Sequence, residues 1–292
     1  MPWFAARTPL ALSRVEEFVR SNEWSCASVG AQLRQRTPLD MLKRRTRFDY
    51  FTLDGENGSV RAISMENSFG FRYPVLSQTA IDAGAAVELG SRSPTSGRRS
   101  MTIMGREQAV CGVEDSVRLA FGREPKYRVE YYLMTRPEGS VLEARSTVAE
   151  HCHFHRADSR HTDQLLAMQI AYEEEEVVVD GRHVDPQATR FHLRDDLREQ
   201  IVFFASYEDR AVAKAGTNAR GFTYDQIGGV YTEPALRGKG ISTALMQILL
   251  NSITESKKNA VLFVKKANKS AIAVYDRLGF ETKDGFIISY YQ

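Results

Sequence analysis

The spacing of apolar side chains changes several times along the chain, and each spacing predicts a type of element. Near the N-terminus the apolar residues recur at helical intervals, and Ser13 can cap the helix that they predict; they are Leu12, Val15, Phe18 and Val19. A second short helix is expected over residues 27–36, because Pro38 disfavours a helical residue before it. Apolar runs at residues 50–53 and 60–65 flank a turn rich in Gly and Asn, which predicts a β-hairpin.

The rest of the first half predicts a strand, a helix and a second strand. Residues 91–99 are rich in Ser, Arg and turn formers and indicate an exposed loop. Apolar runs at 100–104 and 127–134 are typical of strands, and residues 107–121 between them have helical periodicity. This order is that of a β-α-β unit.

The second half, from residue 146, predicts a longer alternation of strands and helices. Strands are expected at 154–157, 201–207, 211–216, 227–232, 260–264 and 286–291, and helices at 162–172, 240–255 and 270–278. The order β-α-β-β-β-α-β-α-β predicts a mixed sheet covered by helices. Together the two halves indicate an α/β (α+β) protein.

Composition narrows the class of protein without naming a function. A chain of 292 residues suggests two domains, at about 150 residues per domain. With 39 Lys and Arg against 37 Asp and Glu, the charge is nearly balanced, so we expect neither a dedicated nucleic-acid binder nor a polybasic membrane binder. The cluster Lys43-Arg44-Arg45-Thr46-Arg47 reads as a solvated basic patch, or as an attraction site for phosphates or an acidic partner.

Cysteine usage and hydropathy favour a cytoplasmic protein. Cys26, Cys111 and Cys152 are odd in number and far apart, which argues against a disulfide framework and a cysteine zinc site. The sequence contains no apolar run of the length that a transmembrane helix needs, and its first 20 residues do not resemble a signal peptide. We therefore expect reduced thiols, a cytoplasmic location and no membrane partner.

The clearest chemical signal is the segment IGGVYTEPALRGKGIS, residues 227–242. It predicts a strand, a turn stopped by Pro, and a Gly-rich entry into a helix. Free N–H groups at a helix N-terminus and the helix dipole hold phosphate or pyrophosphate, and glycines allow close approach of the backbone. The segment matches neither a Walker loop nor G-x-G-x-x-G, and on its own it is equally consistent with a structural turn.

A second segment, NKSAIAVYDRLGF at residues 268–280, makes the two together resemble the GNAT superfamily of acyl-CoA N-acyltransferases. Arg237, Gly240 and Ser242 match the pattern R-x-x-G-x-[GA], with Ser as a small departure at the last position. The second segment matches N-x-x-A-x-x-x-Y-x-x-x-G-[FY] at Asn268, Ala271, Tyr275, Gly279 and Phe280. The resemblance covers about residues 150–292 and implies a mostly antiparallel GNAT sheet flanked by helices.

The resemblance also implies roles for individual residues. Backbone groups of Val230, Tyr231 and Thr232 would pair with the pantetheine arm of acetyl-CoA. Backbone N–H groups would hold the pyrophosphate; they belong to Arg237, Gly238, Lys239, Gly240, Ile241 and Ser242. Asn268 would contact pantetheine, and Tyr275 would lie near the thioester sulfur. The alternative for Tyr275 is a residue packed in the core.

The implied reaction is acyl transfer to an amine, which needs an acid and a base. A free alkylamine is mostly protonated at pH 7, so a carboxylate must remove its proton, directly or through water. The segment AYEEEEV resembles A-Y-x-x-E-E-V of two-domain GNAT-like proteins and makes Glu175 and Glu176 the candidate base; the alternative is a solvated helix end. Asn218, in the segment KAGTNARG, either orients the acceptor or caps a turn. Tyr275 suits the acid that assists the departing thiolate.

The tract His151-Cys152-His153-Phe154-His155 invites a metal interpretation, because a strand would place its three His on one face. No carboxylate or second Cys at ligand spacing completes a set, so we expect no metal.

The first half lacks both acyl-CoA segments. Its residues 101–134 resemble the amino-terminal domain of two-domain GNAT-like proteins, which implies a degenerate GNAT-like domain over residues 1–145 and a catalytic domain over 146–292; a separate regulatory module is the alternative. The expected function is an N-acetyltransferase that uses acetyl-CoA, with a small-molecule amine as acceptor. The alternatives are a protein lysine or N-terminus as acceptor, and an acyl-CoA-binding sensor without turnover.

Overall fold

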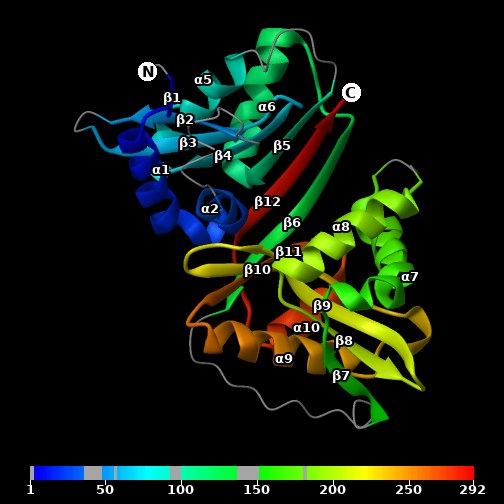
Figure 1. The fold of residues 1–292 in the computed structure, drawn as a ribbon. Coiled ribbons are helices and arrows are strands. Elements are labelled where there is room, and N and C mark those ends of the chain that lie inside the picture. Colours follow the sequence, from blue (N-terminus) through cyan, green and yellow to red (C-terminus); the bar gives the residue numbers. More distant parts are fainter. Residues whose placement is uncertain (1–2, 36–47, 56–57, 93–99, 137–150, 180–182) are drawn as a thin grey trace. The chain divides into compact units, whose positions relative to one another are not determined.

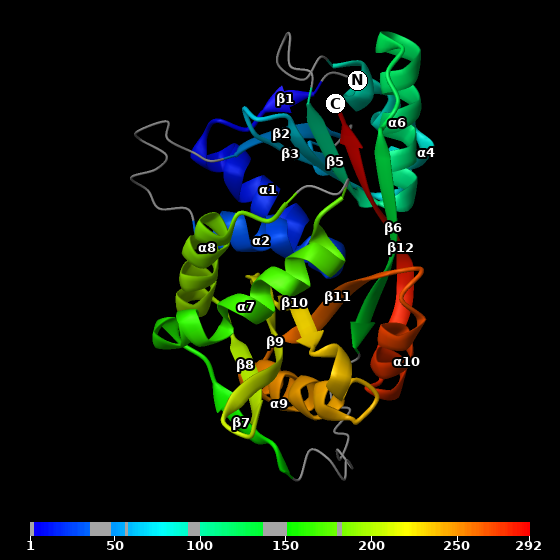
Figure 2. The ribbon, with the colours of Figure 1, turned by 90° about the vertical axis from the view of Figure 1, so that its right-hand side faces the viewer.

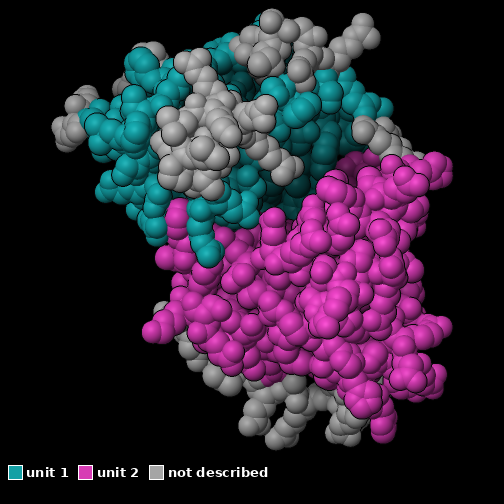
Figure 3. Space-filling model, viewed as in Figure 1, with its two compact units in different colours: residues 1–134, 263–267, 282–292 teal, residues 135–262, 268–281 magenta. Residues whose placement is uncertain are grey.

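A computed structural model describes residues 3–35, 48–55, 58–92, 100–136, 151–179 and 183–292. The chain forms two compact units (Figure 3): unit 1 contains residues 1–134, 263–267 and 282–292, and unit 2 contains residues 135–262 and 268–281. Neither unit is continuous in sequence. The expected domain boundary at residues 145 and 146, the basic patch at 43–47 and most of the loop at 91–99 lie outside the described residues.

Unit 1 is built on a sheet whose strands follow the order β1-β2-β3-β4-β5-β12-β6. Their bounds are β1 Phe4–Ala5, β2 Asp49–Asp54, β3 Val60–Glu66, β4 Phe71–Leu76, β5 Met101–Arg106, β6 Tyr127–Arg136 and β12 Glu281–Tyr291. The predicted hairpin is confirmed as the antiparallel pair β2–β3. Strand β4 pairs in parallel with β5, and β12, from the end of the chain, pairs antiparallel with β5.

The helices of unit 1 are α1 Pro9–Asn22, α2 Ala27–Arg34, α4 Gln78–Asp82, α5 Ala85–Ser91 and α6 Glu107–Phe121. The predicted cap of α1 at Ser13 is wrong: Thr8 caps the helix by accepting a hydrogen bond from the N–H of Ala11 at 3.1 Å, and Pro9 opens it. Helices α5 and α6 pack on each other, and the apolar stripe of α6 is buried in a core with β4 and β5 (Figure 1). Its members include Leu89, Ile103, Val110, Val113 and Val117.

Unit 2 has the strand order β11-β10-β9-β8-β7. The strands are β7 His153–Arg156, β8 Val202–Tyr207, β9 Arg210–Arg220, β10 Tyr224–Thr232 and β11 Asn259–Lys265. All neighbours pair antiparallel except β10 and β11, which pair in parallel. The helices are α7 Thr162–Tyr172, continued by a π-helical turn Glu173–Val177, then α8 Pro186–Glu199, α9 Ile241–Glu255 and α10 Lys269–Arg277.

Helices cover both faces of the unit 2 sheet. Side chains of a strand point alternately to opposite faces, and residues 212–217 of β9 are all buried, so both faces are covered there. Figure 2 shows α7 and α9 on opposite sides of these strands. Helix α9 contributes the apolar residues Leu245, Leu249 and Ile253, and α7 contributes Leu165.

The observed architecture confirms the predicted fold class, a mixed α/β protein with a mostly antiparallel sheet and flanking helices. Within the described ranges, none of the helices combines the length and the apolar character that a membrane crossing requires.

Candidate functional site

The segment between β10 and α9 forms an open, glycine-dependent loop. A short turn, Pro234–Leu236, leaves β10, and Arg237 to Lys239 are exposed. Gly238 and Gly240 have φ of 76° and 79°, a region that residues with a β-carbon enter at a steric cost. A β-carbon placed on Gly238 would have no described atom within 4 Å, so the backbone there is accessible.

Helix α9 begins with its N–H groups available. Gly240 is the N-cap residue, and within the described part of the chain no side chain caps the first turn. Ile241 is 1% exposed, so its side chain belongs to the core and only its backbone faces the loop. Ser242 is half-buried, and the buried hydroxyl oxygen of Thr232, at the end of β10, has no hydrogen-bond partner among the described residues. The arrangement fits a phosphate-bearing ligand, because free N–H groups at a helix start attract anions.

Strand β10 is irregular where the sequence predicts the acyl-CoA arm. Its parallel register with β11 runs from Tyr224 to Ile227, although β10 continues to Thr232. On its other side, the register with β9 shifts between Gly228 and Tyr231, so that two residues of β10 face one residue of β9. This is a β-bulge, and Gly229 within it has φ of 64°.

Asn218 lies beside this irregular region. The register between β9 and β10 passes from Ala219 to Thr217, so Asn218 is the extra residue of a second bulge. Its side chain is exposed and crosses Gly228: a β-carbon on Gly228 would lie 2.8 Å from Asn218 Cγ.

The predicted catalytic residues Tyr275 and Glu176 are brought together in unit 2. Tyr275 is 8% exposed, and its ring packs edge-on against Phe280 with 5.9 Å between centroids. Burial raises the pKa of Tyr275 well above its ordinary value, and the nearby Tyr172 and Glu176 raise it further. The Tyr275 hydroxyl is therefore protonated at neutral pH.

Asn268 connects the start of α10 to the acidic turn. Its Oδ1 accepts a hydrogen bond from the N–H of Ala271 at 3.0 Å and so caps α10. Its Nδ2 donates to Glu176 Oε1 at 3.1 Å. The neighbouring Glu175 accepts a hydrogen bond from Arg237 Nη2 at 2.6 Å, and Arg237 Nε donates to the carbonyl of Thr232. The two glutamates thus contact two different residues of the predicted acyl-CoA site.

Two further residues of this region had no role assigned from sequence. Lys214 of β9 is 4% exposed; its Nζ donates to the carbonyl of Gly229 at 2.8 Å and lies 4.7 Å from the ring centroid of Tyr172. Burial lowers the pKa of Lys214 to about 8, against the opposing charges of Asp196 and Glu173. Burial also raises the pKa of Tyr172, while a backbone hydrogen bond from Gly229 opposes that shift. The sequence signals for this contact are a lysine between apolar residues of one strand and the pair Gly228-Gly229 within another.

The histidine tract takes part in ordinary packing. His155 Nε2 lies 2.9 Å from Ser206 Oγ, and its ring stacks on Phe204 at 4.9 Å. Among the residues that the structure describes, no group of three or more His, Cys, Asp or Glu is arranged to hold a metal ion.

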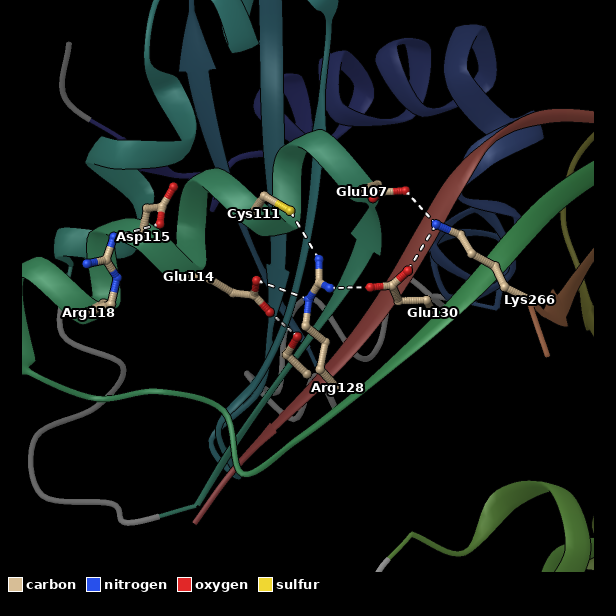
Figure 4. Close-up of polar contacts among 9 residues, drawn as sticks. Glu107, Cys111, Glu114, Asp115, Arg118, Arg128, Glu130 and Lys266 are labelled. Carbon is tan, nitrogen blue, oxygen red and sulfur yellow. Dashed lines mark hydrogen bonds and ion pairs between the residues drawn. The ribbon is translucent and has the colours of Figure 1, made fainter.

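A second polar cluster lies in unit 1 on α6 and the neighbouring strands (Figure 4). Lys266 Nζ bridges Glu107 and Glu130 at 3.1 Å each, and Arg128 pairs with Glu130 and Glu114. Partial burial raises the pKa of the Cys111 thiol, although Arg128 donates a hydrogen bond to its sulfur. Because each charge has an opposite partner and the thiol stays protonated at neutral pH, the cluster indicates a structural role.

Comparison with known proteins follows the same division of the chain. Residues 143–280 match the sequence model of the Acetyltransferase (GNAT) family. No curated protein sequence matches the chain. The matched segment includes β10, the loop before α9, and α10, which are the elements described above.

Solved structures resemble the chain over nearly its whole length at low sequence identity. A Drosophila protein has a TM-score of 0.66 and 10% identity, covering 97% of this chain and 96% of its own. A tandem GNAT protein from the clavulanic acid biosynthesis pathway, without AcCoA, has a TM-score of 0.61 and 11% identity, covering 99% and 98%. A GNAT-family acetyltransferase from Colwellia psychrerythraea has a TM-score of 0.56 and 12% identity, covering 100% of both chains. At these identities the likeness establishes a shared fold.

Proposed function

Through residues 143–280 the chain belongs to the GNAT acetyltransferase family, and we propose that it is an N-acetyltransferase that moves an acetyl group from acetyl-CoA to a primary amine. The observation that carries the proposal is the uncapped start of α9 behind two left-handed glycines, in the same unit as the buried Tyr275 and the half-buried Glu176 near it. Acetyl-CoA supplies the activated thioester. The acceptor that we propose is a small-molecule amine.

The anion-binding end supports acyl-CoA as the donor. The N–H groups from Gly238 to Ser242 lie around the start of a 15-residue helix, and their dipoles suit a pyrophosphate. The N–H of Arg237 instead donates to the carbonyl of Pro234 at 3.3 Å, so the proposed contribution of this residue's backbone would require that bond to open. Arg237 at present pairs with Glu175, so a bound pyrophosphate would compete with that carboxylate for the guanidinium.

The end of β10 supports binding of the pantetheine arm in the manner of an added strand. The register with β11 ends at Ile227, so the backbone of Val230, Tyr231 and Thr232 is the proposed partner of the arm. The bulge at Gly229 turns the backbone immediately before these residues. We assign the N–H of Val230 to the thioester carbonyl, where it would stabilise the developing oxyanion.

Tyr275 is the proposed general acid. Its hydroxyl is protonated at neutral pH because burial and the charge of Glu176 raise its pKa. A protonated hydroxyl near the sulfur can donate to the thiolate as the C–S bond breaks. Asn268, at the start of the same helix, is the proposed contact to pantetheine.

Glu176 is the proposed base, acting directly or through one water, and Asn218 the proposed acceptor-orienting residue. Glu176 faces Asn268 and Tyr275, whereas Glu175 is bound by Arg237. The two adjacent carboxylates therefore make a matched pair for a test. Glu176→Gln should reduce kcat strongly at pH 7. Glu175→Gln should leave kcat nearly unchanged and raise the affinity for acetyl-CoA, because the carboxylate no longer competes for Arg237.

The first 145 residues are proposed to form a degenerate GNAT-like domain that lacks its own acyl-CoA site.

The three cysteines are free thiols in the structure, which supports our placing the enzyme in the reducing cytoplasm.

The function is tested by incubating the full chain with acetyl-CoA and a panel of amines, with mass spectrometry of the products. We expect one or more small amines to gain 42 mass units, about the mass of an acetyl group replacing hydrogen. A panel of peptides with free lysine and free N-termini separates the protein-acceptor alternative. Tight binding of acetyl-CoA without any acetylated product would support the sensor instead and contradict the proposal.

A further inference from the structure

Lys214 is a buried cation in β9 of unit 2, the strand that also carries Asn218, and the proposed chemistry gives it no role. In the sheet it pairs with Phe204 of β8 on one side and Tyr231 of β10 on the other. Its side chain is 4% exposed, and the desolvation of a buried ammonium is costly unless it is compensated. A lysine in this setting therefore needs a partner whose interaction with the ammonium offsets the free-energy cost of desolvation.

The partner is the carbonyl of Gly229, which the bulge removes from the regular ladder. The register passes from Gly228 to Tyr231 without a pairing for Gly229. A carbonyl that leaves the ladder needs another donor, and Lys214 Nζ supplies one at 2.8 Å. A β-carbon on Gly229 would lie 3.0 Å from the same Nζ, so the glycine lets the two groups meet.

Two residues act on the backbone of Gly229. Lys214 Nζ donates to its carbonyl, and the same backbone lies close enough to the Tyr172 hydroxyl to oppose the rise in the pKa of Tyr172. The Tyr172 ring also lies 4.7 Å from Lys214 Nζ, a distance at which an aromatic face attracts a cation. The three residues form a closed set that fixes the peptide immediately before Val230.

The groups around Lys214 determine its charge. Glu173 of the π-helical turn and Asp196 of α8 attract the ammonium, and Tyr172 of α7 presents its ring. Strands β8 and β10 place Phe204 and Tyr231 beside it. His192, Asp195 and Glu199 lie one step further out, around Asp196. The pKa of Lys214 is lowered to about 8 because burial outweighs the two carboxylates, so the ammonium predominates at pH 7 and is lost in mildly alkaline solution.

We propose that Lys214 is the positioning residue of the acyl site: its ammonium fixes the Gly229 carbonyl and thereby aims the next N–H, that of Val230, at the thioester carbonyl. This inference rests on the proposed function, because it assumes that the acetyl group lies at the bulge. It adds a positive charge behind the peptide that polarises its N–H toward the developing oxyanion. It also links the reactivity of the thioester to the protonation of a residue that does not touch the substrate.

The first test needs no acceptor amine. Acetyl-CoA labelled with ¹³C at the thioester carbonyl is bound to the full chain, and its carbonyl chemical shift is followed from pH 6.5 to 9.5. A hydrogen-bonded carbonyl resonates downfield, so we expect the bound signal to move upfield with a midpoint of about 8 as Lys214 loses its proton. In Lys214→Gln, which donates a hydrogen bond without a charge, the signal should show no such midpoint.

The second test separates positioning from cofactor binding. Lys214→Met removes donor and charge, and we expect kcat to fall by about 10²-fold, comparable to the loss of one oxyanion donor. The Kd for CoA should stay within about twofold, because the pyrophosphate loop is unchanged. Lys214→Arg should restore most of kcat and abolish the alkaline decline of kcat near pH 8.

Lys258 provides the matched control. It is also a largely buried lysine of unit 2, with its Nζ 2.7 Å from the carbonyl of Gly221 and 2.8 Å from Asp225. Lys258→Met should lower stability and leave the carbonyl signal and its pH midpoint as in the wild type.

The outcomes distinguish this inference from the proposed function. If acetyl-CoA does not bind the wild-type chain, the proposed function fails and the inference fails with it. If acetyl-CoA binds and is consumed, but Lys214→Met and Lys214→Gln retain the wild-type carbonyl shift, midpoint and kcat, only the inference is overturned.

Discussion

The two units repeat one chain layout and differ at the junction between strand and helix. Unit 1 runs β4, α4, α5, β5, α6, and unit 2 runs β10, loop, α9, β11, α10. In unit 2 the junction is an open loop whose helix begins uncapped by any described side chain. In unit 1 the same junction is filled by α4, which Ser77 caps by accepting a hydrogen bond from the N–H of Ala80.

The strands before the two junctions also differ: β4 of unit 1 is regular and β10 of unit 2 is bulged. The β3–β4 register runs without a shift from Glu66↔Arg72 to Ala62↔Leu76, whereas β10 carries the bulge at Gly229. Arg72, nearly fully buried, donates to the carbonyl of Leu89 at the end of α5, so a cation of unit 1 satisfies a helix end. In unit 2 a buried cation instead satisfies a bulge.

The second helices complete the contrast. In α10, Asn268 caps the helix and Tyr275 lies two turns further on. At the same distance from the start of α6 stands Val113, which is fully buried and has no hydroxyl. If unit 2 holds the proposed site, the comparison teaches that the layout alone is not enough: unit 2 also has open backbone donors and a buried hydroxyl, which unit 1 lacks at the corresponding positions.

The largest expected effect tests the Tyr275 hydroxyl of α10, which has no counterpart at Val113 of α6. Tyr275→Phe keeps the ring packed on Phe280, and we expect kcat to fall by about 10²–10⁴-fold while acetyl-CoA affinity changes little. The control is Tyr73→Phe in unit 1, whose hydroxyl donates to the carbonyl of Ser25 at 2.9 Å. It should cost about 1 kcal/mol of stability and leave kcat unchanged. A full-rate Tyr275→Phe enzyme would reduce Tyr275 to a core residue.

The second effect tests the two left-handed glycines that precede equivalent helices. Gly240 and Gly84 are the N-cap residues of α9 and α5, with φ of 79° and 75°. A valine strains either position by about 1–2 kcal/mol, but only Gly240→Val should obstruct the pyrophosphate and weaken acetyl-CoA binding by about 10²-fold or more. Calorimetry on both folded variants measures this. Equal affinities for the two would remove the distinction between the junctions.

The third effect is on stability. The pKa of Lys214 is about 8 in the folded chain against an ordinary value of 10.5, so the unfolded chain binds more protons between these values and stability rises with pH there. Relative to Lys214→Met, the wild type should gain about 3 kcal/mol between pH 8 and 10.5. Urea titrations of both proteins from pH 7 to about 10.5 measure the difference in their free energies of unfolding, and the contributions of the groups that both proteins share cancel in it. A constant difference would mean that Lys214 titrates normally.

The smallest effect is a count. If only the junction of unit 2 accepts a pyrophosphate, acetyl-CoA binds once per chain. Calorimetric titration of the wild-type chain should give a stoichiometry of one. In Gly240→Val the heat of binding should disappear at the same concentrations, because the single site is weakened. Two equivalents per chain would show that the first half keeps a site of its own.

Much of the fold could be predicted because the local signals agree with one another. The predicted helix at 107–121 has the observed bounds of α6, since its apolar stripe and the Gly122 that ends it act together. Strand β4 was not predicted, because Pro74 disfavours an interior strand. The strand accommodates Pro74 because β4 pairs with β5 only at Phe71 and Arg72. The missing N–H of Pro74 therefore removes no hydrogen bond between β4 and β5.

Helix α8 was also not predicted, although its start is well marked. Asp185 caps it and Pro186 opens it, yet its sequence is mostly polar and its buried side chains are Thr189, Leu193 and Leu197. For the candidate site, the glycine loop and the segment around Tyr275 have recognisable patterns. The contact of Lys214 with Gly229 depends on a register shift between two strands. The pair Gly228-Gly229 is typical of a bulge in β10, but nothing in either strand alone predicts which residue of the other strand lies opposite it.

The membership of β12 in unit 1 has a consequence for the order of synthesis. The strand lies between β5 and β6 in the order of that sheet, so unit 1 has a gap at an interior position until the last residues of the chain are translated. The first half therefore leaves the ribosome with β5 lacking one neighbour, and it completes its core only after unit 2 has emerged. The C-terminal strand therefore completes the core of the first half, through Ile287 and Tyr291, and its pairing with β5 is a contact of long sequence separation, of the kind that slows folding.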